Sequence, residues 1–215
     1  MYYNLTAIIL KREVFREDDL ILTAYSLERG KSVLQVRGGK KIKSKLAGHL
    51  EPISLSNLEI VRGKQIDQLI GASLKNSYNN IKGDLIKLAY ASYFLELILN
   101  LTKENYKDER IFNLLRKALD FLDRQEISKT EYKLARISFG FKMLFLLGFS
   151  PVEKAGLKHS DKIDFVTKSD IGEICASKQA IDSMAWLNRV LNKELEDCLE
   201  VPIKTKNFFK YVQNG

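Results

Sequence analysis

The sequence predicts an α+β protein in which an all-β module is followed by a mainly α-helical domain. Three observations carry this prediction. The chain has 215 residues with 45% hydrophobic content, enough to bury the cores of one or two domains. Up to about residue 80, turn signals cut it into short runs rich in β-branched and aromatic residues. From Ile81 the hydrophobic period changes from two toward 3.6. We therefore expect domains at 1–80 and 81–215.

Five strands are expected in the first domain, at 3–11, 20–27, 32–37, 53–62 and 66–74. Three of the four breaks are short, and Gly30 and Gly63 are expected to supply the positive φ angles of tight turns. The remaining break, "GGKKIKSKLAGHLEP" at 38–52, is longer than a hairpin needs. Five strands with one long connection between the third and fourth are typical of an OB-fold barrel.

Four helices are expected in the second domain, at 83–101, 111–122, 128–147 and 179–199. The third should begin with a capping box, because Glu131 follows Ser128 by three residues, and it should stop at Gly148. Residues 153–178 form a mixed, polar insert, in which "KIDFVTK" and "GEICA" suggest a short hairpin.

Composition narrows the classes of function. Lys and Arg outnumber Asp and Glu by 35 to 27, a net charge of +8 that favours an anionic partner. The first residues do not resemble a secretory signal, and the apolar runs are short or interrupted by charge, so we expect a cytoplasmic protein with no membrane partner. Two cysteines and two histidines are too scattered for a disulfide framework or a four-ligand metal site, so we expect neither metal nor cofactor.

The strongest local signal is a run of basic residues that contains no Asp or Glu. Between residues 29 and 50 it comprises Arg29, Lys31, Arg37, Lys40, Lys41, Lys43 and Lys45. In an extended chain Lys41, Lys43 and Lys45 project to one side, and the preceding glycines allow close approach to a ligand. The segment therefore suits a phosphate backbone, although a solvated lysine-rich loop would have the same composition.

Two further clusters have alternative interpretations. Near the end, Lys204, Lys206 and Lys210 alternate with aromatic residues, which suits phosphates and stacked bases, or equally a tail that packs its aromatics on the helical domain.

Glu17, Asp18 and Asp19 could hold Mg²⁺ in a nuclease, but a charged turn paired with neighbouring arginines explains them more simply. The sequence has no phosphate-binding GxxxxGK[ST] loop and no GxSxG motif, so we expect no catalytic site and no small-molecule substrate.

These residues resemble the bacterial recombination mediator family RecO. The resemblance rests on an apolar strand, an acidic turn with Glu17 and Asp19, the "GK" of Gly30 and Lys31, and a glycine and basic run before "LAGHLEP". It continues in "FGFKMLFLLGFSP" (139–151) and "IKTKNFF" (203–209), so it covers nearly the whole chain. Gly140 departs from it, because an acidic residue is common there.

The resemblance implies a non-enzymatic protein that binds single-stranded and duplex DNA, anneals complementary strands, and with RecR loads RecA onto DNA coated by single-stranded DNA-binding protein (SSB). Such proteins dock the acidic, aromatic-ended tail of SSB on the helical domain, where Arg116 and Arg136 are the candidates here. It also implies a cytoplasmic, nucleoid-associated protein. The candidate DNA-binding residues are Lys31, Arg37, Lys40, Lys41, Lys43, Lys45, Arg62, Lys64, Lys204 and Lys206.

The chain departs from the family at one site. Many relatives carry a zinc site of two CxxC pairs, whereas "GEICASK" keeps only Cys175 and "VEKAGLKH" has no cysteine. Structural zinc needs four ligands, so we expect none in this insert. Three other classes stay open: an RNA-binding OB-fold factor associated with ribosomes or tRNA, a pure protein adaptor, and the nuclease.

Overall fold

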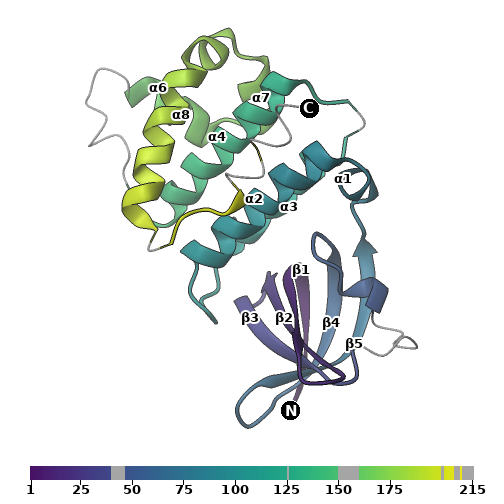
Figure 1. Ribbon diagram of the computed structural model, residues 1–215. Coiled ribbons are helices and arrows are strands. Elements are labelled where there is room, and N and C mark those ends of the chain that lie inside the picture. Colours follow the sequence, from purple (N-terminus) through teal and green to yellow (C-terminus); the bar gives the residue numbers. More distant parts are fainter. Residues whose placement is uncertain (40–46, 125, 150–159, 200, 206–208, 210–215) are drawn as a thin grey trace. The chain divides into compact units, whose positions relative to one another are not determined.

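The computed structural model describes residues 1–39, 47–124, 126–149, 160–199, 201–205 and 209. They form two compact units (Figure 1). The barrel unit consists of 1–79 together with 102–113, and the helical unit consists of 80–101 together with the described part of 114–215. The segment between the first two long helices therefore returns to the barrel unit, which the sequence pattern does not indicate.

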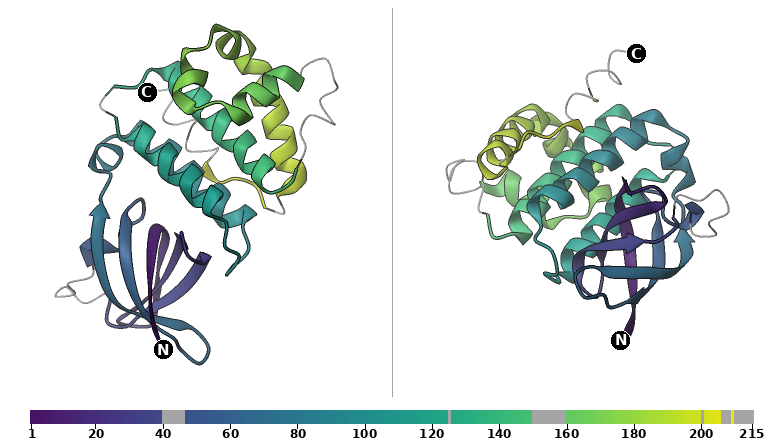
Figure 2. Two further views of the ribbon diagram at one scale, coloured as in Figure 1. Left: turned by 180° about the vertical axis from the view of Figure 1, so that it is seen from behind. Right: turned by 60° about the horizontal axis from the view of Figure 1, so that its bottom comes forward.

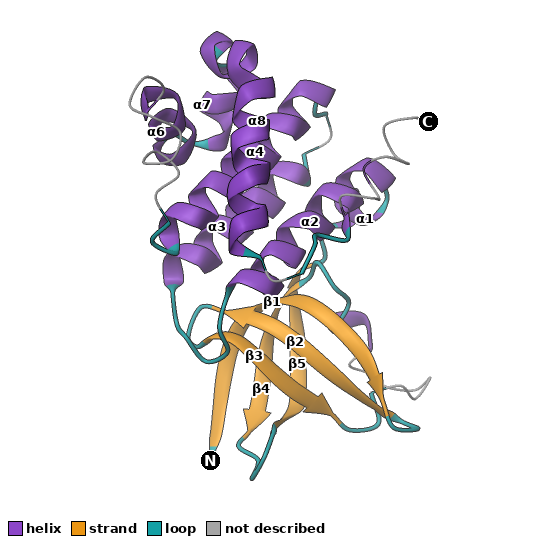
Figure 3. Ribbon diagram, turned by 60° about the vertical axis from the view of Figure 1, so that its left-hand side comes forward, coloured by secondary structure: helices purple, strands orange, loops and turns teal. Residues whose placement is uncertain are grey.

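The barrel unit contains the five strands that the sequence predicts, and the predicted OB-type barrel is confirmed (Figure 3). They are β1 (Tyr2–Phe15), β2 (Asp19–Ser26), β3 (Gly30–Val36), β4 (Leu55–Val61) and β5 (Asp67–Asn76). The sheet closes in the order β1-β2-β3-β5-β4. All neighbours are antiparallel except β3 and β5, which run parallel over only three residue pairs, Leu34–Val36 with Asp67–Leu69.

Strand β1 closes the barrel because it pairs on both sides. Residues 2–8 pair with β4 and residues 7–15 with β2, and the register to β2 shifts at a bulge between Ile9 and Lys11. A bulge adds twist and bend, which lets one long strand serve two neighbours. The strand extends beyond the predicted end at residue 11, since its second half lies in the hairpin with β2.

Alternate residues of the strands fill the barrel core, as a period of two requires. Leu50, from the connection between β3 and β4, joins this core and is 1% exposed. The same connection contains the short 3-10 helix η1 (Ala47–His49). Gly30 has the predicted positive φ, 71°, but the prediction for Gly63 is wrong. A Cβ at Gly63 would lie 1.8 Å from the Ile66 carbonyl oxygen, so crowding and not a left-handed backbone requires glycine there.

The four predicted helices are present with bounds close to their predicted ranges, and the described residues form three further short helices that were not predicted. In chain order the helices are α1 (Asn79–Lys82), α2 (Leu85–Leu101), α3 (Glu109–Leu122), α4 (Lys129–Leu146), α6 (Ser160–Lys168), α7 (Ile171–Ala176) and α8 (Lys178–Cys198). The first residues of α3 belong to the barrel unit. Ser128 and Glu131 form the predicted capping box of α4, and Gly148 follows that helix with φ 85°. Helix α4 packs against α2, α6, α7 and α8 (Figure 2).

The hairpin predicted in the polar insert is wrong, because both of its segments are helical in α6 and α7. Ile163 and Val166 are three residues apart and both buried, which is a helical spacing. Asp170 caps α7, and Glu173 completes a second capping box. Local capping thus decides the structure of a segment whose β-branched residues suggested strands. Of the helices that the structure describes, none is both long and apolar enough to cross a membrane.

Candidate nucleic-acid interface

The structure places four of the predicted DNA-binding residues of the barrel, and they lie at two ends of β3. Arg37 is exposed where the strand ends, and Lys31 is half-buried where it begins. Six residue steps separate Lys31 from Arg37, about 20 Å of extended chain. Arg62 and Lys64 are exposed in the turn before β5, which runs parallel to β3, so they lie toward the Lys31 end and not beside Arg37.

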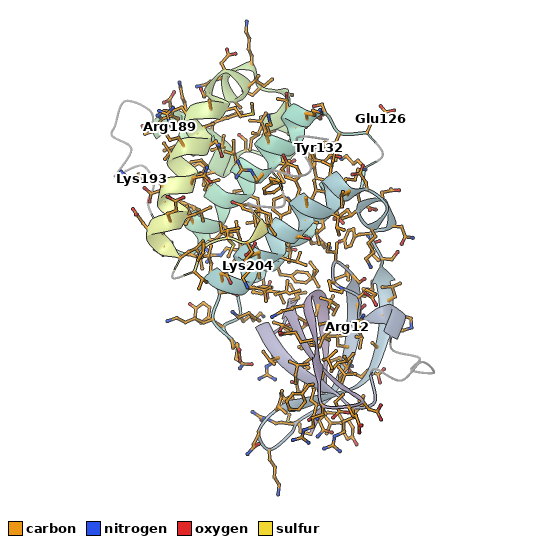
Figure 4. All side chains as sticks on the ribbon, viewed as in Figure 1. Arg12, Glu126, Tyr132, Arg189, Lys193 and Lys204 are labelled. Carbon is orange, nitrogen blue, oxygen red and sulfur yellow. The ribbon has the colours of Figure 1, made fainter. Side chains whose placement is uncertain are left out.

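The remaining candidates divide into residues with and without a described position. Lys204 is exposed (Figure 4), and its backbone N–H donates to the Glu96 carboxylate at 2.7 Å. Lys40, Lys41, Lys43, Lys45 and Lys206 lie outside the described residues. DNA binding by the lysine-rich connection at 38–52 therefore stays a prediction. The geometry below concerns the end of β3 that begins at Lys31.

The sequence analysis placed Arg29 in the basic run but not among the candidate DNA-binding residues, and the structure holds it in a fixed position. Its guanidinium donates to the Tyr3 hydroxyl at 2.6 Å, to the Asp67 carboxylate at 3.1 Å and to the Asn105 side-chain oxygen at 3.0 Å. It also lies over the Tyr3 ring, 5.0 Å from the centroid. Because residues 3, 29, 67 and 105 are distant in the sequence, no local pattern could have indicated this cluster.

The carboxylate of Asp67 joins the Arg29 cluster to the neighbouring turn. It accepts hydrogen bonds from the Tyr3 hydroxyl and from the Gly63 N–H. Burial raises the pKa of Asp67, but the hydrogen bonds from Tyr3, Gly63 and Arg29 outweigh burial and leave that pKa below its ordinary value. Burial and the bond to Asp67 raise the pKa of Tyr3 to about 12. At neutral pH the Asp67 carboxyl is therefore ionised, whereas the Tyr3 hydroxyl keeps the proton that it donates to Asp67.

The segment 102–108 covers the start of β3. Glu104 forms a parallel bridge with Lys31, and the Asn105 N–H donates to the Lys31 carbonyl at 2.8 Å. Tyr25 donates from its hydroxyl to the Asp108 carbonyl at 3.3 Å. Gly30 makes this approach possible, since a Cβ there would lie 2.1 Å from the Tyr106 carbonyl oxygen.

A cavity of about 380 Å³ opens between this segment and the turn before β5. Its lining includes Arg29, Ser32, Arg62, Gln65, Asp67, Glu104 and Asn105. The lining therefore combines two arginines, two carboxylates, two amides and a hydroxyl within the barrel unit. Burial lowers the pKa of the nearby Lys31, whereas the charge of Glu104 raises it.

The acidic cluster considered for a nuclease has a structural role at Asp19. This carboxylate accepts from the Gly38 N–H and from the Gln35 amide, both at 2.9 Å. The Gly38 bond and then the Gln35 bond lower the pKa of Asp19. Asp19 thereby fixes the backbone where the lysine-rich connection leaves β3. In the part of the chain that the structure describes, no three Asp, Glu, His or Cys side chains gather as a metal site.

The two arginines predicted to bind a partner differ in environment. Arg116 is exposed on α3, whereas Arg136 on α4 is half-buried and donates to the Asn188 side-chain oxygen. The Arg136 guanidinium lies over Tyr93 and Phe209, 5.5 and 5.9 Å from the ring centroids. Phe209 also packs on Tyr90 at 4.7 Å, so this aromatic residue of the tail packs on the helical unit.

A second hollow, which the sequence analysis missed, lies in the helical unit. It is lined by residues of α3, α4 and the α6–α7 turn. Its basic residues are Lys117, Arg124, Lys142 and Lys168, beside apolar Leu114 and Phe121. Lys142 donates to the Ser169 carbonyl, and Lys117 lies 4.0 Å from Asp170. These four cations come from α3, the bend after α3, α4 and α6, so they meet only in the folded chain, although the 3.6 period places Leu114, Lys117 and Phe121 on one face of α3.

Comparison with known proteins gives consistent matches over most of the chain. The model of the family described as "Recombination protein O N terminal" matches residues 1–78, and that of "Recombination protein O C terminal" matches residues 82–192. The "DNA repair protein RecO" of Desulforamulus reducens is 35% identical over 151 residues, which are 70% of this chain and 56% of that protein. The protein of the same name from Alkaliphilus metalliredigens is 27% identical over 203 residues, 93% of this chain and 81% of that protein. This chain thus spans little more than half of the first relative in its match.

Proposed function

The chain belongs to the RecO family, and on that premise we propose that it acts in DNA repair as a recombination mediator. In this proposal it binds single-stranded and duplex DNA, anneals complementary strands, and with RecR helps to load RecA onto SSB-coated single strands. It works by binding alone, without a catalytic step. It carries out these steps in the cytoplasm, at the nucleoid.

One observation carries the DNA-binding part of the proposal: exposed basic residues stand at both ends of β3 on an OB-type barrel. Arg62 and Lys64 lie at one end, and Arg37 leads into the lysine-rich connection at the other. Contacts from such residues to phosphates do not depend on base sequence. A surface that holds two complementary strands lowers their repulsion and raises their effective concentration, which promotes annealing without ATP.

The hollow of the helical unit supports the partner-binding part. An acidic peptide that ends in an aromatic residue needs cations for its carboxylates and an apolar surface for its ring. Lys117, Arg124, Lys142 and Lys168 outnumber the two carboxylates of the lining, Asp120 and Asp170. Leu114 and Phe121 line the hollow but are 9% and 4% exposed, so they offer a ring little surface. On its surplus of cations, the hollow is our preferred site for the tail of SSB. Arg116, also on α3, is exposed and able to extend this site, whereas Arg136 would have to leave Tyr93 and Phe209.

A salt series tests the DNA-binding proposal. Binding of a labelled single strand of about 30 nucleotides is measured for the unchanged protein and for a variant with Lys40, Lys41, Lys43 and Lys45 changed to Ala. If about four phosphate contacts are lost, the slope of log K against log salt flattens by roughly 3. Equal affinities and slopes would remove the lysine-rich connection from the interface, and negligible binding by both proteins at physiological salt would favour the adaptor.

Competition between a DNA and an RNA strand of matched sequence separates the mediator from an RNA-binding factor. The mediator requires DNA to compete at least as well as RNA. An RNA strand that displaces the DNA at much lower concentration would favour a ribosome- or tRNA-associated role.

A further inference from the structure

The cavity at the start of β3 is a gap in the pairing of the barrel wall. On one side, Lys31 pairs with Glu104. On the other, pairing with β5 begins only at Leu34. Ser32 and Val33 fall between these two pairings, and both line the cavity. With about 380 Å³, the cavity falls within the size range of small-molecule sites.

Ser32 supplies an unsatisfied polar group at this gap. Its residue is 3% exposed, and its hydroxyl oxygen has no hydrogen-bond partner among the described residues. The period of two places it on the same face of β3 as Leu34 and Val36, whose side chains belong to the barrel core. A buried hydroxyl without a partner is destabilising. A ligand that hydrogen-bonds to it would remove that cost.

The charges of the lining argue against a phosphate as this ligand. The two arginines, Arg29 and Arg62, are matched by two carboxylates, Asp67 and Glu104. Arg29 is already engaged with Tyr3, Asp67 and Asn105. An anion entering the cavity would meet the carboxylates without a net surplus of positive charge. A neutral ligand fits this balance better.

The polar groups of the lining are mixed donors and acceptors. The Gln65 and Asn105 side chains each have a carbonyl and an NH₂ group, and the Ser32 hydroxyl can donate or accept. A nucleobase is neutral and has both donors and acceptors on its edge. We propose that this cavity binds one unpaired nucleobase of a DNA strand whose phosphates contact the basic residues of the barrel. This inference rests on the proposed DNA-binding function and adds the preference for single strands.

The preference follows from the geometry of the base. In a duplex the Watson–Crick edge is already paired and the base is stacked, so it reaches a recess in a protein only after it is extruded. An unpaired base has its edge available. The exposed residues Arg62 and Lys64 still bind phosphates of either form. The cavity thus raises single-strand affinity above that of the duplex.

The test compares two labelled strands of about 20 units, one with normal bases and one with stable abasic tetrahydrofuran units, at equal phosphate number and at a fixed salt concentration. We expect the unchanged protein to favour the base-bearing strand on the order of tenfold, the contribution of one well-bound base. Gln65→Ala, an exposed position, should reduce this ratio severalfold. Lys64→Ala is the matched control, because it should weaken both strands equally.

A second variant tests whether misfolding, and not loss of the base site, reduces the ratio of the two affinities. Ser32→Ala removes the hydroxyl without a partner, so it should raise the midpoint of thermal unfolding and still reduce the ratio. If the unchanged protein binds both strands equally, or if Gln65→Ala and Ser32→Ala both keep its ratio, the base site is wrong and the proposed DNA-binding function stands. If neither strand binds, the proposed function and the base site both fail.

Discussion

The barrel unit and the helical unit are both rich in cations but use them differently. In the barrel unit, Arg37, Arg62 and Lys64 stand exposed at strand ends and turns. In the helical unit, Lys87 is 4% exposed and donates to the Arg124 carbonyl, and the half-buried Lys142 donates to the Ser169 carbonyl. Net charge alone therefore does not locate a binding surface, since a buried cation holds the fold and an exposed one is available to a partner. Each unit has both kinds, because Arg29 is fixed in the barrel unit and Arg116 is exposed in the helical unit.

The largest expected effect concerns the close contact between Gly30 and segment 102–108 in the barrel unit. Gly30→Ala should lower the free energy of unfolding by more than about 2 kcal/mol, because alanine is strained at φ 71° and its Cβ would overlap the Tyr106 carbonyl. Urea unfolding measures the change. Gly48→Ala, where a Cβ meets nothing within 4 Å, is the control and should change little. Equal stability of the two variants would mean that the packing of segment 102–108 does not require a glycine at position 30.

The next effect tests the structural cations of the helical unit. Lys87→Met keeps the apolar stem but removes the ammonium group that donates to Arg124, so we expect a loss of about 1–2 kcal/mol. DNA affinity should not change. Urea unfolding and a binding titration together check this, and a variant that loses DNA affinity at unchanged stability would overturn the contrast between the units.

The pH dependence of stability tests the Arg29 cluster. The pKa of Asp67 is lower in the folded protein, so its contribution is present above the unfolded pKa of about 4 and is lost as pH falls through the folded value. Between pH 6 and pH 3 the unchanged protein should lose more stability than Asp67→Asn. Glu17→Gln, on an exposed turn, should behave as the unchanged protein does. The raised pKa of Tyr3 acts at the other end, since its contribution is lost as pH rises from about 10 to about 12.

The smallest effect concerns the exposed cations. Lys64→Ala should leave the free energy of unfolding within about 0.5 kcal/mol. It should flatten the salt slope for single-stranded DNA by about 0.7, the contribution of one phosphate contact. A change in stability without a change in slope would assign Lys64 to the fold and not to the interface.

Elements with local signals were predicted well. The five strands follow from alternation and turn residues, and the start of α4 follows from Ser128 and Glu131. The hairpin expected in the insert failed for a local reason as well, because Asp170 and Glu173 cap a helix that the β-branched residues concealed. Secondary structure can thus be predicted from signals that lie within a few residues of one another. Where two such signals conflict, the stronger one determines the structure.

The candidate site depended on long-range pairing, which the sequence does not reveal. The parallel pairing of β3 with β5 is what places Arg62 and Lys64 away from Arg37. The Arg29 cluster unites residues from two strands, a turn and segment 102–108. That segment, "TKENYKD", is polar and lacks the alternation of a strand, so nothing in it indicates that it pairs with Lys31.

The return of segment 102–108 to β3 also bears on how the protein can be divided. A shortened protein that ends at residue 79 would keep all five strands but lose the partner of Lys31. The first half of β3 would then present an open edge, and open edges recruit strands from other copies. We expect such a fragment to self-associate through that edge. The segment between α2 and α3 therefore prevents the barrel from pairing with the barrel of another copy.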